Sequence, residues 1–188
     1  MKEKIFEKSI ELFGERGFNE TSIQHIVDAL GVTKGTFYYY FKSKEEILLG
    51  IHLRFIDDLL AKQSQIIHDG NKSCEQKLYE IVYMLIKNVE TQAQSARVFF
   101  REMQNLSEGP HSQIFPKRDE FRLNLQRLIE DGIAKGEFRK EIQADIVTLG
   151  ILGMCNWSYH WFDPQGPLTD QTVAKIYMDM ILQGIKTD

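Results

Sequence analysis

The chain has 188 residues and a formal net charge of −4, and 43% of its residues are hydrophobic and 27% charged. This composition argues against extensive disorder, and the length allows a sizeable core within one or two domains. The negative net charge argues against a protein that coats nucleic acid indiscriminately, whereas a sequence-specific binder needs only a locally basic surface.

The first two predicted helices are short and amphipathic. Apolar residues at helical spacing predict a helix over residues 3–16, which Gly17 ends. Thr21 is expected to cap the second helix, with Gln24 at the position that completes a capping box. Gly31 ends this helix and begins a tight turn, because glycine adopts positive φ angles without steric cost.

A third short helix follows this turn. Thr33 is its natural N-cap, and the helix is predicted to continue through Tyr40. Two helices separated by only Gly31 and Val32 are the sequence form of a helix-turn-helix, in which the second helix lies in the major groove of DNA. The pattern alone leaves one alternative open, a small helical subdomain whose tyrosines are merely half-buried.

This third helix is predicted to have an outer polar face and an inner apolar face. Phe37 and Phe41 are four residues apart and must both point inward. The stretch 33–44 contains lysines and no acidic residue, so the chain is locally positive there. The groups suited to DNA contact are the hydroxyls, the ammonium, the phenols and the unhindered backbone of Thr33, Lys34, Gly35, Thr36, Tyr38 and Tyr39.

The remainder of the chain is also predicted to be helical. Ser43 and Glu46 form a capping box that opens a long helix. A polar connection is expected at residues 108–110. Apolar periodicity predicts further helices over residues 73–90, 96–106, 113–135, 144–162 and 169–185. No segment predicts a strand, so the expected fold is all-α.

The helix-turn-helix region resembles a known family. The run 21–45, and above all the segments Gly-Val-Thr-Lys-Gly-Thr-Phe-Tyr (31–38) and Tyr-Phe-Lys-Ser-Lys-Glu (40–45), is similar to the N-terminal domain of the TetR family of bacterial regulators. The resemblance implies a three-helix DNA-binding domain, here residues 1–46. It also implies a larger ligand-binding and dimerisation domain, here residues 47–188, joined to the first through the long fourth helix.

The resemblance also assigns DNA contacts outside the third helix. It implies that Thr21 and Ser22 contact phosphate at the start of the second helix, and that Lys44 contacts phosphate at the start of the fourth. Gln24 falls where family members often place a base-reading side chain, so it has two predicted roles. Tyr40 departs from the family pattern, in which histidine is common at this position.

The predicted ligand site lies in the C-terminal helices. Aromatic stripes such as Phe99, Phe100 and Met103 are usually core, but the resemblance implies a cavity that some of them line. The segment Asn-Trp-Ser-Tyr-His-Trp-Phe-Asp-Pro (156–164) is similar to one in TetR-type regulators that respond to fatty-acyl or steroid-derived coenzyme A thioesters. The segment adds Asn156, Trp157, Tyr159 and Trp161 to the predicted ligand-binding residues. An equally supported alternative is that this segment packs in a dimer interface.

A homodimer is expected on two grounds. Gly150 and Gly153, with Ala144 and Cys155, make one side of their helix thin enough for a second backbone to approach closely. One recognition helix also reads too few bases for a regulator. The last helix would complete half of a four-helix interface with Val173, Ile176, Tyr177, Met180 and Ile181.

These features predict a ligand-responsive transcriptional regulator. The preferred reading is a repressor that binds a pseudo-palindromic operator in double-stranded DNA and is released by a small apolar ligand such as an acyl-CoA. The alternative within the family is a regulator of efflux that responds to aromatic or cationic drug-like ligands. A helical interaction protein that never touches DNA is the alternative outside it.

Other classes of function have no support in the sequence. There is no phosphate-binding glycine loop, nucleophile elbow or H-E-x-x-H motif, so no enzyme is predicted. Cys74 and Cys155 are far apart and the histidines are scattered, so no metal or cofactor is expected. The N-terminus lacks a secretory signal, and the longest apolar stretch, residues 146–157, is too short for a membrane span, so we predict a cytoplasmic protein.

Overall fold

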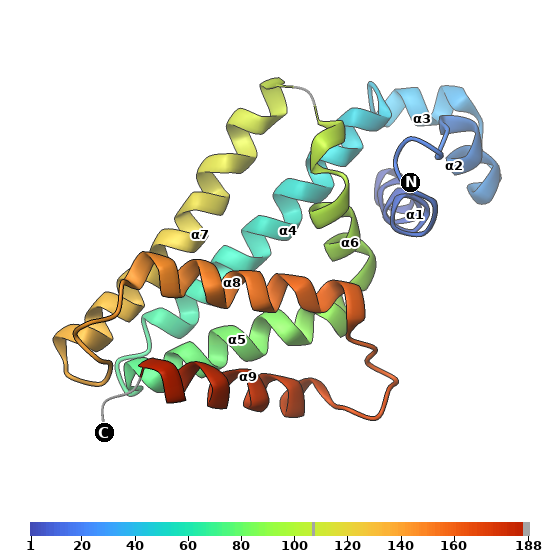
Figure 1. Ribbon diagram of the computed structural model, residues 1–188. Coiled ribbons are helices and arrows are strands. Elements are labelled where there is room, and N and C mark those ends of the chain that lie inside the picture. Colours follow the sequence, from blue (N-terminus) through green and yellow to red (C-terminus); the bar gives the residue numbers. More distant parts are fainter. Residues whose placement is uncertain (107, 186–188) are drawn as a thin grey trace. The chain divides into compact units, whose positions relative to one another are not determined.

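The computed structural model describes residues 1–106 and 108–185, which form helices joined by short connections (Figure 1). No strand occurs in these ranges, which confirms the predicted all-α fold class. Nor is any helix there long and apolar enough to cross a membrane. The elements are α1 (Lys2–Arg16), α2 (Ile23–Leu30), α3 (Lys34–Tyr40), α4 (Lys44–Ile67), α5 (Cys74–Thr91), α6 (Ala93–Arg101), the 3-10 turn η1 (Met103–Asn105), α7 (Glu108–Ala134), α8 (Ala144–Trp161) and α9 (Asp170–Ile185).

Packing divides the chain into two compact units. The N-terminal unit comprises residues 1–57 and 92–116, and the C-terminal unit comprises residues 58–91 and the chain from residue 117 onward. The helices α4 and α7 each contribute one part to both units. The N-terminal unit therefore holds α6 and η1 as well as α1, α2 and α3. These units are defined by packing. The division into a DNA-binding domain of residues 1–46 and a ligand-binding and dimerisation domain of residues 47–188 stays a prediction.

The core of the N-terminal unit is built on α1, which packs against α2 and α6. Phe13 of α1 is completely buried and meets the ring of Phe18 edge-on, with the ring centroids 5.2 Å apart. Phe37 of α3 and Phe41, its C-cap, are buried with their ring centroids 6.0 Å apart. This confirms the prediction that both phenylalanines point inward. A seven-residue helix such as α3 depends on this packing, because short helices are marginal in isolation.

The start of α2 lies one residue later than predicted. Its N-cap is Ser22, whose hydroxyl accepts a hydrogen bond from the backbone N–H of His25 at 3.2 Å. The His25 ring completes the box by accepting from the backbone N–H of Ser22 at 3.3 Å. The capping box of Thr21 and Gln24 was wrongly predicted, because the Thr21 hydroxyl is turned toward the end of α1 and the Gln24 amide donates to Asp28 at 2.6 Å.

The start of α7 also differs from the sequence prediction. Residues 108–110 were expected to be a connection, but α7 begins at Glu108. Pro110 lies in its first turn, where a proline is tolerated because the backbone N–H groups there have no intrahelical partner. The residues that were read as a polar connection therefore form the start of a helix.

In the C-terminal unit, α5 packs against α8 and α9. The Ser158 hydroxyl of α8 and the Tyr177 hydroxyl of α9 lie 3.0 Å apart and hydrogen-bond. Gln63 is completely buried in the α4 part of this unit, where its amide donates to the backbone oxygen of Phe121 at 2.9 Å and accepts from Asn124 at 3.1 Å. A buried amide with partners on both sides fixes the register of α4 against α7, because an unpaired one would be costly.

The packing around Gly132 gives a stability test. A Cβ atom there would lie 2.3 Å from a ring carbon of the buried Phe138 and 3.2 Å from the Cβ of Cys74. We expect Gly132→Ala to lower the free energy of unfolding by about 1–3 kcal/mol, as overpacking does in a rigid core. Thermal unfolding followed by circular dichroism measures this. Gly70→Ala, where no atom lies within 4 Å of the added Cβ, is the control and should change stability little.

Candidate DNA interface and ligand site

The turn between α2 and α3 has the geometry that a helix-turn-helix needs. Gly31 adopts the left-handed conformation, with φ 64° and ψ 33°, and its N–H bonds to the last turn of α2. Thr33 is the N-cap of α3 as predicted, because its hydroxyl accepts from the Thr36 backbone N–H at 3.2 Å. The two helices pack on each other across this turn. Only a residue without a Cβ takes the Gly31 conformation without strain.

The outer face of α3 carries polar groups as predicted. Tyr39 is 81% exposed and Tyr38 is 56% exposed, although the Tyr38 ring also rests edge-on against Phe37. Thr33, Lys34 and Gly35 are exposed and Thr36 is half-buried. The hydroxyls of Thr33 and Thr36 lie 3.2 Å apart and fix each other's rotamers. The face therefore offers hydroxyls, one ammonium and phenols, which are the groups that contact base edges and phosphates.

Two exposed residues beside this surface escaped the sequence prediction. His25 stands next to Ser22 at the start of α2, and Lys42 follows α3. The capping-box spacing from Ser22 would have indicated His25, and the run of lysines without acids would have indicated Lys42. Ser22 and Gln24, which were predicted to contact DNA, are also exposed.

Thr21 was wrongly predicted to contact phosphate with its side chain. The residue is completely buried, and its hydroxyl donates to the backbone oxygens of Gly17 at 2.7 Å and Leu12 at 3.3 Å. A hydroxyl committed to buried carbonyls cannot also reach a phosphate. The role of Thr21 is to satisfy the end of α1.

The side chain of Lys44 is half-buried and also has partners within the protein. Its ammonium donates to the backbone oxygens of Phe18 at 2.8 Å and Thr21 at 3.2 Å, and lies 4.1 Å from the centroid of the Phe18 ring. An ammonium has three hydrogens, so a phosphate can use the one that remains. The phosphate contact of Lys44 stays a prediction, and the structure adds a role in holding the connection between α1 and α2.

Among the predicted ligand-binding residues, three belong to the N-terminal unit. Phe99 of α6 is buried, with its ring centroid 4.8 Å from that of Phe55 and 5.3 Å from that of His52. The Phe100 ring meets Phe99 edge-on at 5.2 Å and is half-buried, as is Met103 in η1. We call Phe99 and Phe100, whose rings contact each other and Phe55, the aromatic wall of α6. Met103 lies outside this helix.

The other four predicted ligand-binding residues lie on α8 and do not share one face. Trp157 is 63% exposed and Trp161 45% exposed, on the same side of the helix as Gly150 and Gly153. Tyr159 is half-buried on the opposite side, and Asn156 is half-buried between the two. The segment therefore has an outward tryptophan face and an inward tyrosine face.

The inward face of α8 is apolar in character. Cys155 is completely buried, and it lies opposite the glycines rather than beside them as the sequence had predicted. Burial raises the pKa of the Cys155 thiol to about 12. Burial, and to a smaller extent the neighbouring Cys155, also raises the pKa of the Tyr159 phenol. Both groups therefore stay uncharged at physiological pH and suit an apolar environment.

A surface cavity of about 380 Å³ lies between α5 and α9. Tyr79, Met178 and Leu182 form part of its lining, with Lys175 and Asp179 among its charged residues. None of the residues predicted to bind the ligand lines it. Within the described residues, no group of three or more histidine, cysteine or acidic side chains is placed to hold a metal ion.

Together, α2, the Gly31 turn and α3 define a helix-turn-helix DNA-binding protein. The chain belongs to the TetR family of bacterial regulators: residues 5–51 match "Bacterial regulatory proteins, tetR family", and residues 71–185 match "Tetracyclin repressor-like, C-terminal domain". The protein is therefore a ligand-responsive DNA-binding transcriptional regulator and not an enzyme.

Individual relatives agree with this assignment over nearly the whole chain. The transcriptional repressor KstR2 of Mycobacterium tuberculosis is 28% identical over 183 residues, which are 97% of this chain and 91% of KstR2. The structure of this ketosteroid transcriptional regulator superposes with a TM-score of 0.91, covering 100% of this chain and 95% of the other. The regulator PfmR of Thermus thermophilus is 30% identical with a TM-score of 0.88, covering 95% and 97%.

The outer face of α3 gives a test of base reading. Lys34 is exposed at the start of α3. We expect Lys34→Ala and Thr36→Val to change operator preference at one or two positions, by about 1–3 kcal/mol each. Selection from a randomised site, followed by measurement of the dissociation constant on single-base variants, provides the readout. If the preference is unchanged, the bases are read elsewhere, with Gln24 and His25 to be tested next.

Proposed function

We propose that the protein is a homodimeric repressor that binds a pseudo-palindromic operator and is released from it by a coenzyme A thioester with a long apolar acyl group. The observation that carries the proposal is the two-sided construction of α8. One face of this helix is left uncovered in the single chain, and the other lines the core of the C-terminal unit. The first face supports the dimer, and the segment that ends the helix supports the ligand.

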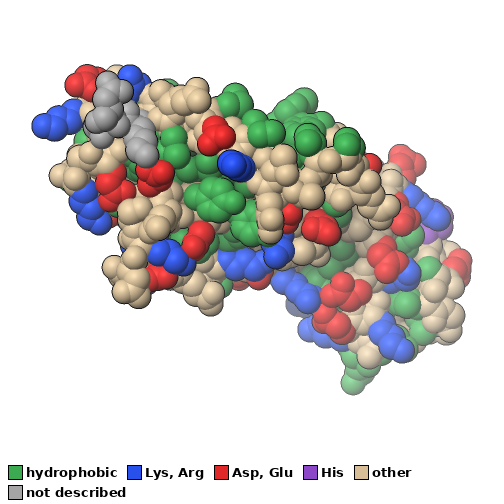
Figure 2. Space-filling model, turned by 90° about the horizontal axis from the view of Figure 1, so that it is seen from below, with side chains coloured by type: hydrophobic (Ala, Val, Ile, Leu, Met, Phe, Trp, Pro, Cys, Tyr) green, Lys and Arg blue, Asp and Glu red, His purple; other side chains and the backbone are tan. Residues whose placement is uncertain are grey.

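The uncovered face of α8 exposes several large apolar side chains. On α8 it contains Ile146 (58% exposed), Leu149 (52%) and the two tryptophans, and no atom lies within 4 Å of a Cβ added at Gly150 or Gly153. Figure 2, which views the molecule from the side of α9, shows hydrophobic side chains gathered over the C-terminal part between charged ones. Large exposed apolar patches on soluble proteins mark interaction sites.

The last helix extends this face. Ile176 is 46% exposed and Met180 60% exposed, whereas Val173 and Ile181 of the same helix are buried inside the chain. Of the residues predicted for the interface, only the outward ones can meet a partner. A second copy of the same face would cover both helices at once, because a two-fold interface is self-complementary. We therefore assign Trp157 and Trp161 to the dimer interface.

The class of ligand rests on the chemistry of the chain and on its relatives. The segment 156–164 resembles those of regulators that respond to acyl-CoA, and KstR2 is named as a ketosteroid transcriptional regulator. The buried and half-buried rings of Phe99 and Phe100 suit an apolar acyl group. Repression follows the naming of KstR2 as a transcriptional repressor.

The dimer is tested by a charge on its face. Met180→Glu places a carboxylate among the exposed apolar residues of α9, Ile176 and Met180, which we call the α9 stripe. Pairing of two copies would bury this carboxylate without a partner. We expect sedimentation to show a monomer and operator affinity to fall by about tenfold or more, since each half-site then binds alone. Gln171→Glu, an exposed position outside the stripe, is the matched control and should stay dimeric. A dimeric Met180→Glu protein would contradict the assignment of this face.

The ligand is tested with the purified protein bound to its operator. We expect oleoyl-CoA, or the coenzyme A thioester of a steroid-derived acid, to raise the dissociation constant for operator by about tenfold or more, which requires about 1.4 kcal/mol of preference for the released form. Free coenzyme A should have no effect. If neither thioester binds or changes operator affinity, the ligand class is wrong. Release by an aromatic cation instead would support a regulator of efflux.

A further inference from the structure

The C-terminal end of α1 is completed by side chains from outside the helix. Gly17, its C-cap, has φ 98° and ψ 158°, which is not the left-handed conformation that lets a helix close its own last carbonyls. Its N–H bonds to Phe13, and the Thr21 hydroxyl serves the backbone oxygens of Leu12 and Gly17. Further hydrogen bonds to this end have to come from elsewhere.

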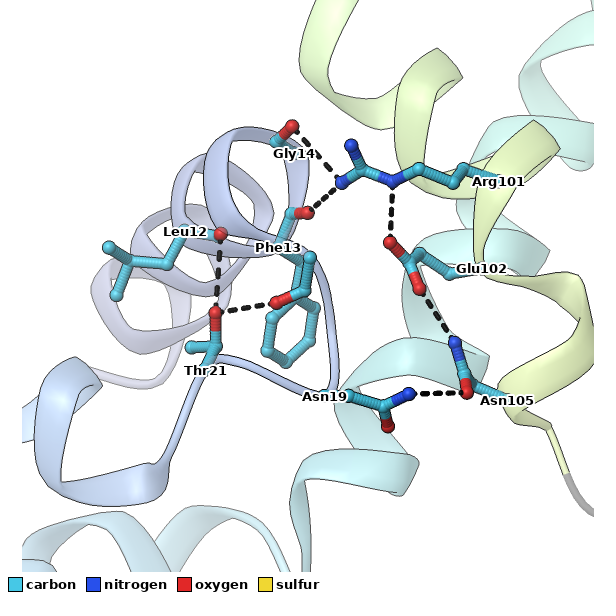
Figure 3. A network of polar contacts seen from close by, with 9 residues as sticks. Leu12, Phe13, Gly14, Asn19, Thr21, Arg101, Glu102 and Asn105 are labelled. Carbon is cyan, nitrogen blue, oxygen red and sulfur yellow. Dashed lines mark hydrogen bonds and ion pairs between the residues drawn. The ribbon is translucent and has the colours of Figure 1, made fainter.

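Arg101 at the end of α6 supplies them. Its Nη2 donates to the backbone oxygens of Phe13 at 2.6 Å and Gly14 at 3.2 Å (Figure 3). The C-terminal end of a helix carries a partial negative charge, so a guanidinium there is favourable electrostatically as well. Charge-assisted bonds of this kind are short and strong.

A buried carboxylate orients this guanidinium. Glu102 is only 4% exposed, and its Oε1 lies 2.6 Å from Nε of Arg101. Its Oε2 accepts from the Asn105 amide at 2.7 Å, and the Asn105 side-chain oxygen accepts from Asn19 at 3.1 Å. Figure 3 shows the resulting chain of contacts, which joins the end of α6 and η1 to the last turn of α1 and to the connection that follows it. We call Arg101, Glu102, Asn105 and Asn19 the polar latch.

The same connection is held from α4 by the ammonium of Lys44, through the backbone oxygens of Phe18 and Thr21. The cation of Lys44 in α4 therefore fixes the connection from which α2 starts, and the cation of Arg101 at the end of α6 fixes the last turn of α1 that leads into it. The backbone of α1 also comes close to α6 at Gly14, where an added Cβ would lie 3.1 Å from the Cβ of Gln94.

We propose that Arg101 is a positioning residue for operator binding: through the polar latch it holds the α1–α2 connection in the operator-binding orientation, and a ligand that displaces α6 releases that hold. The second half rests on the proposed function, because α6 also carries Phe99 and Phe100, which are among the residues predicted to bind the ligand. The first half needs no ligand.

The polar latch can respond to a movement of α6 because its contacts are hydrogen bonds, which are directional. Hydrogen bonds weaken steeply with distance and angle, whereas apolar contacts tolerate sliding. A shift of α6 by about 1 Å would carry the contacts of Arg101 beyond hydrogen-bond length. A small movement of the aromatic wall would therefore break the hydrogen bonds of the polar latch to the end of α1 and to Asn19.

The test compares two arginines of α6. Arg101→Met removes the donors but keeps the aliphatic stem, and Arg97→Met changes an exposed arginine one turn earlier as the matched control. We expect ligand-free operator affinity to fall by about tenfold for Arg101→Met and to stay near wild type for Arg97→Met, with Arg101→Lys intermediate because an ammonium keeps the charge but lacks the planar fork. Fluorescence anisotropy on an operator fragment selected from random DNA provides the dissociation constants.

Two further readouts separate positioning from other roles. The slope of affinity against salt concentration should not change in Arg101→Met, because Arg101 contacts carbonyls and not phosphates. The ratio of operator affinities without and with oleoyl-CoA should fall toward one, because the latch that the ligand opens is already absent. A direct phosphate contact would lower the salt slope, and that result would overturn the proposal.

The remaining outcomes are also decisive. If Arg101→Met and Arg97→Met bind operator equally well, the proposal is overturned. If Arg101→Met does not fold, as judged by circular dichroism, Asn19→Ala and Arg101→Lys take its place, and operator affinity at the wild-type level in both overturns it. If oleoyl-CoA fails to release the wild-type protein, the proposed inducer is wrong, while the ligand-free comparison still decides the role of Arg101.

Discussion

Backbone carbonyls at the end of a helix have no partner within it, and in this protein that constraint acts on the end of α1. Because Gly17 does not close the helix in the left-handed conformation, hydrogen-bond donors come from Thr21 and Arg101, while Lys44 donates to carbonyls of the connection just beyond the helix. Each donor lies on a different segment of the chain. The end of α1 and the connection that follows it therefore tie together α1, the start of α2, α4 and α6.

The same constraint shapes the DNA-binding surface. Since the Thr21 hydroxyl is used at the end of α1, capping of α2 passes to Ser22 and His25. Beyond Gly31, α3 is too short to be stable alone, and the burial of Phe37 holds it in place. Its hydroxyls, ammonium and phenols are then free to point outward. Recognition chemistry is thus displayed on a helix that exists only because its other face is packed.

In the C-terminal unit, α8 combines two surfaces of different character. Its inner side holds Cys155 and Tyr159, which burial keeps uncharged, and its outer side exposes tryptophans beside glycines. A continuous aromatic segment in the sequence is in this way divided between core and surface. This division allows one helix to serve both the apolar interior and an interface with a second copy.

The sequence by itself determined the all-α fold class, the helix-turn-helix with its glycine turn and the outward polar face of α3. These features depend on residues close together in the chain, through helical period, cap residues and the positive φ of Gly31. The family resemblance rests on the same short run of residues.

Only the tertiary structure decided which side chains are buried and which distant acceptor each polar side chain bonds. Helical spacing could not show that Thr21 is buried, that Lys44 and Arg101 serve carbonyls near α1, or which ring of the segment 156–164 points inward. A hydroxyl or an ammonium has several chemically equivalent partners along a sequence, and its hydrogen bond goes to whichever acceptor the packed chain brings within about 3 Å. That choice depends on helices separated by as many as 88 positions, between Phe13 and Arg101, and so it is made only when the chain folds.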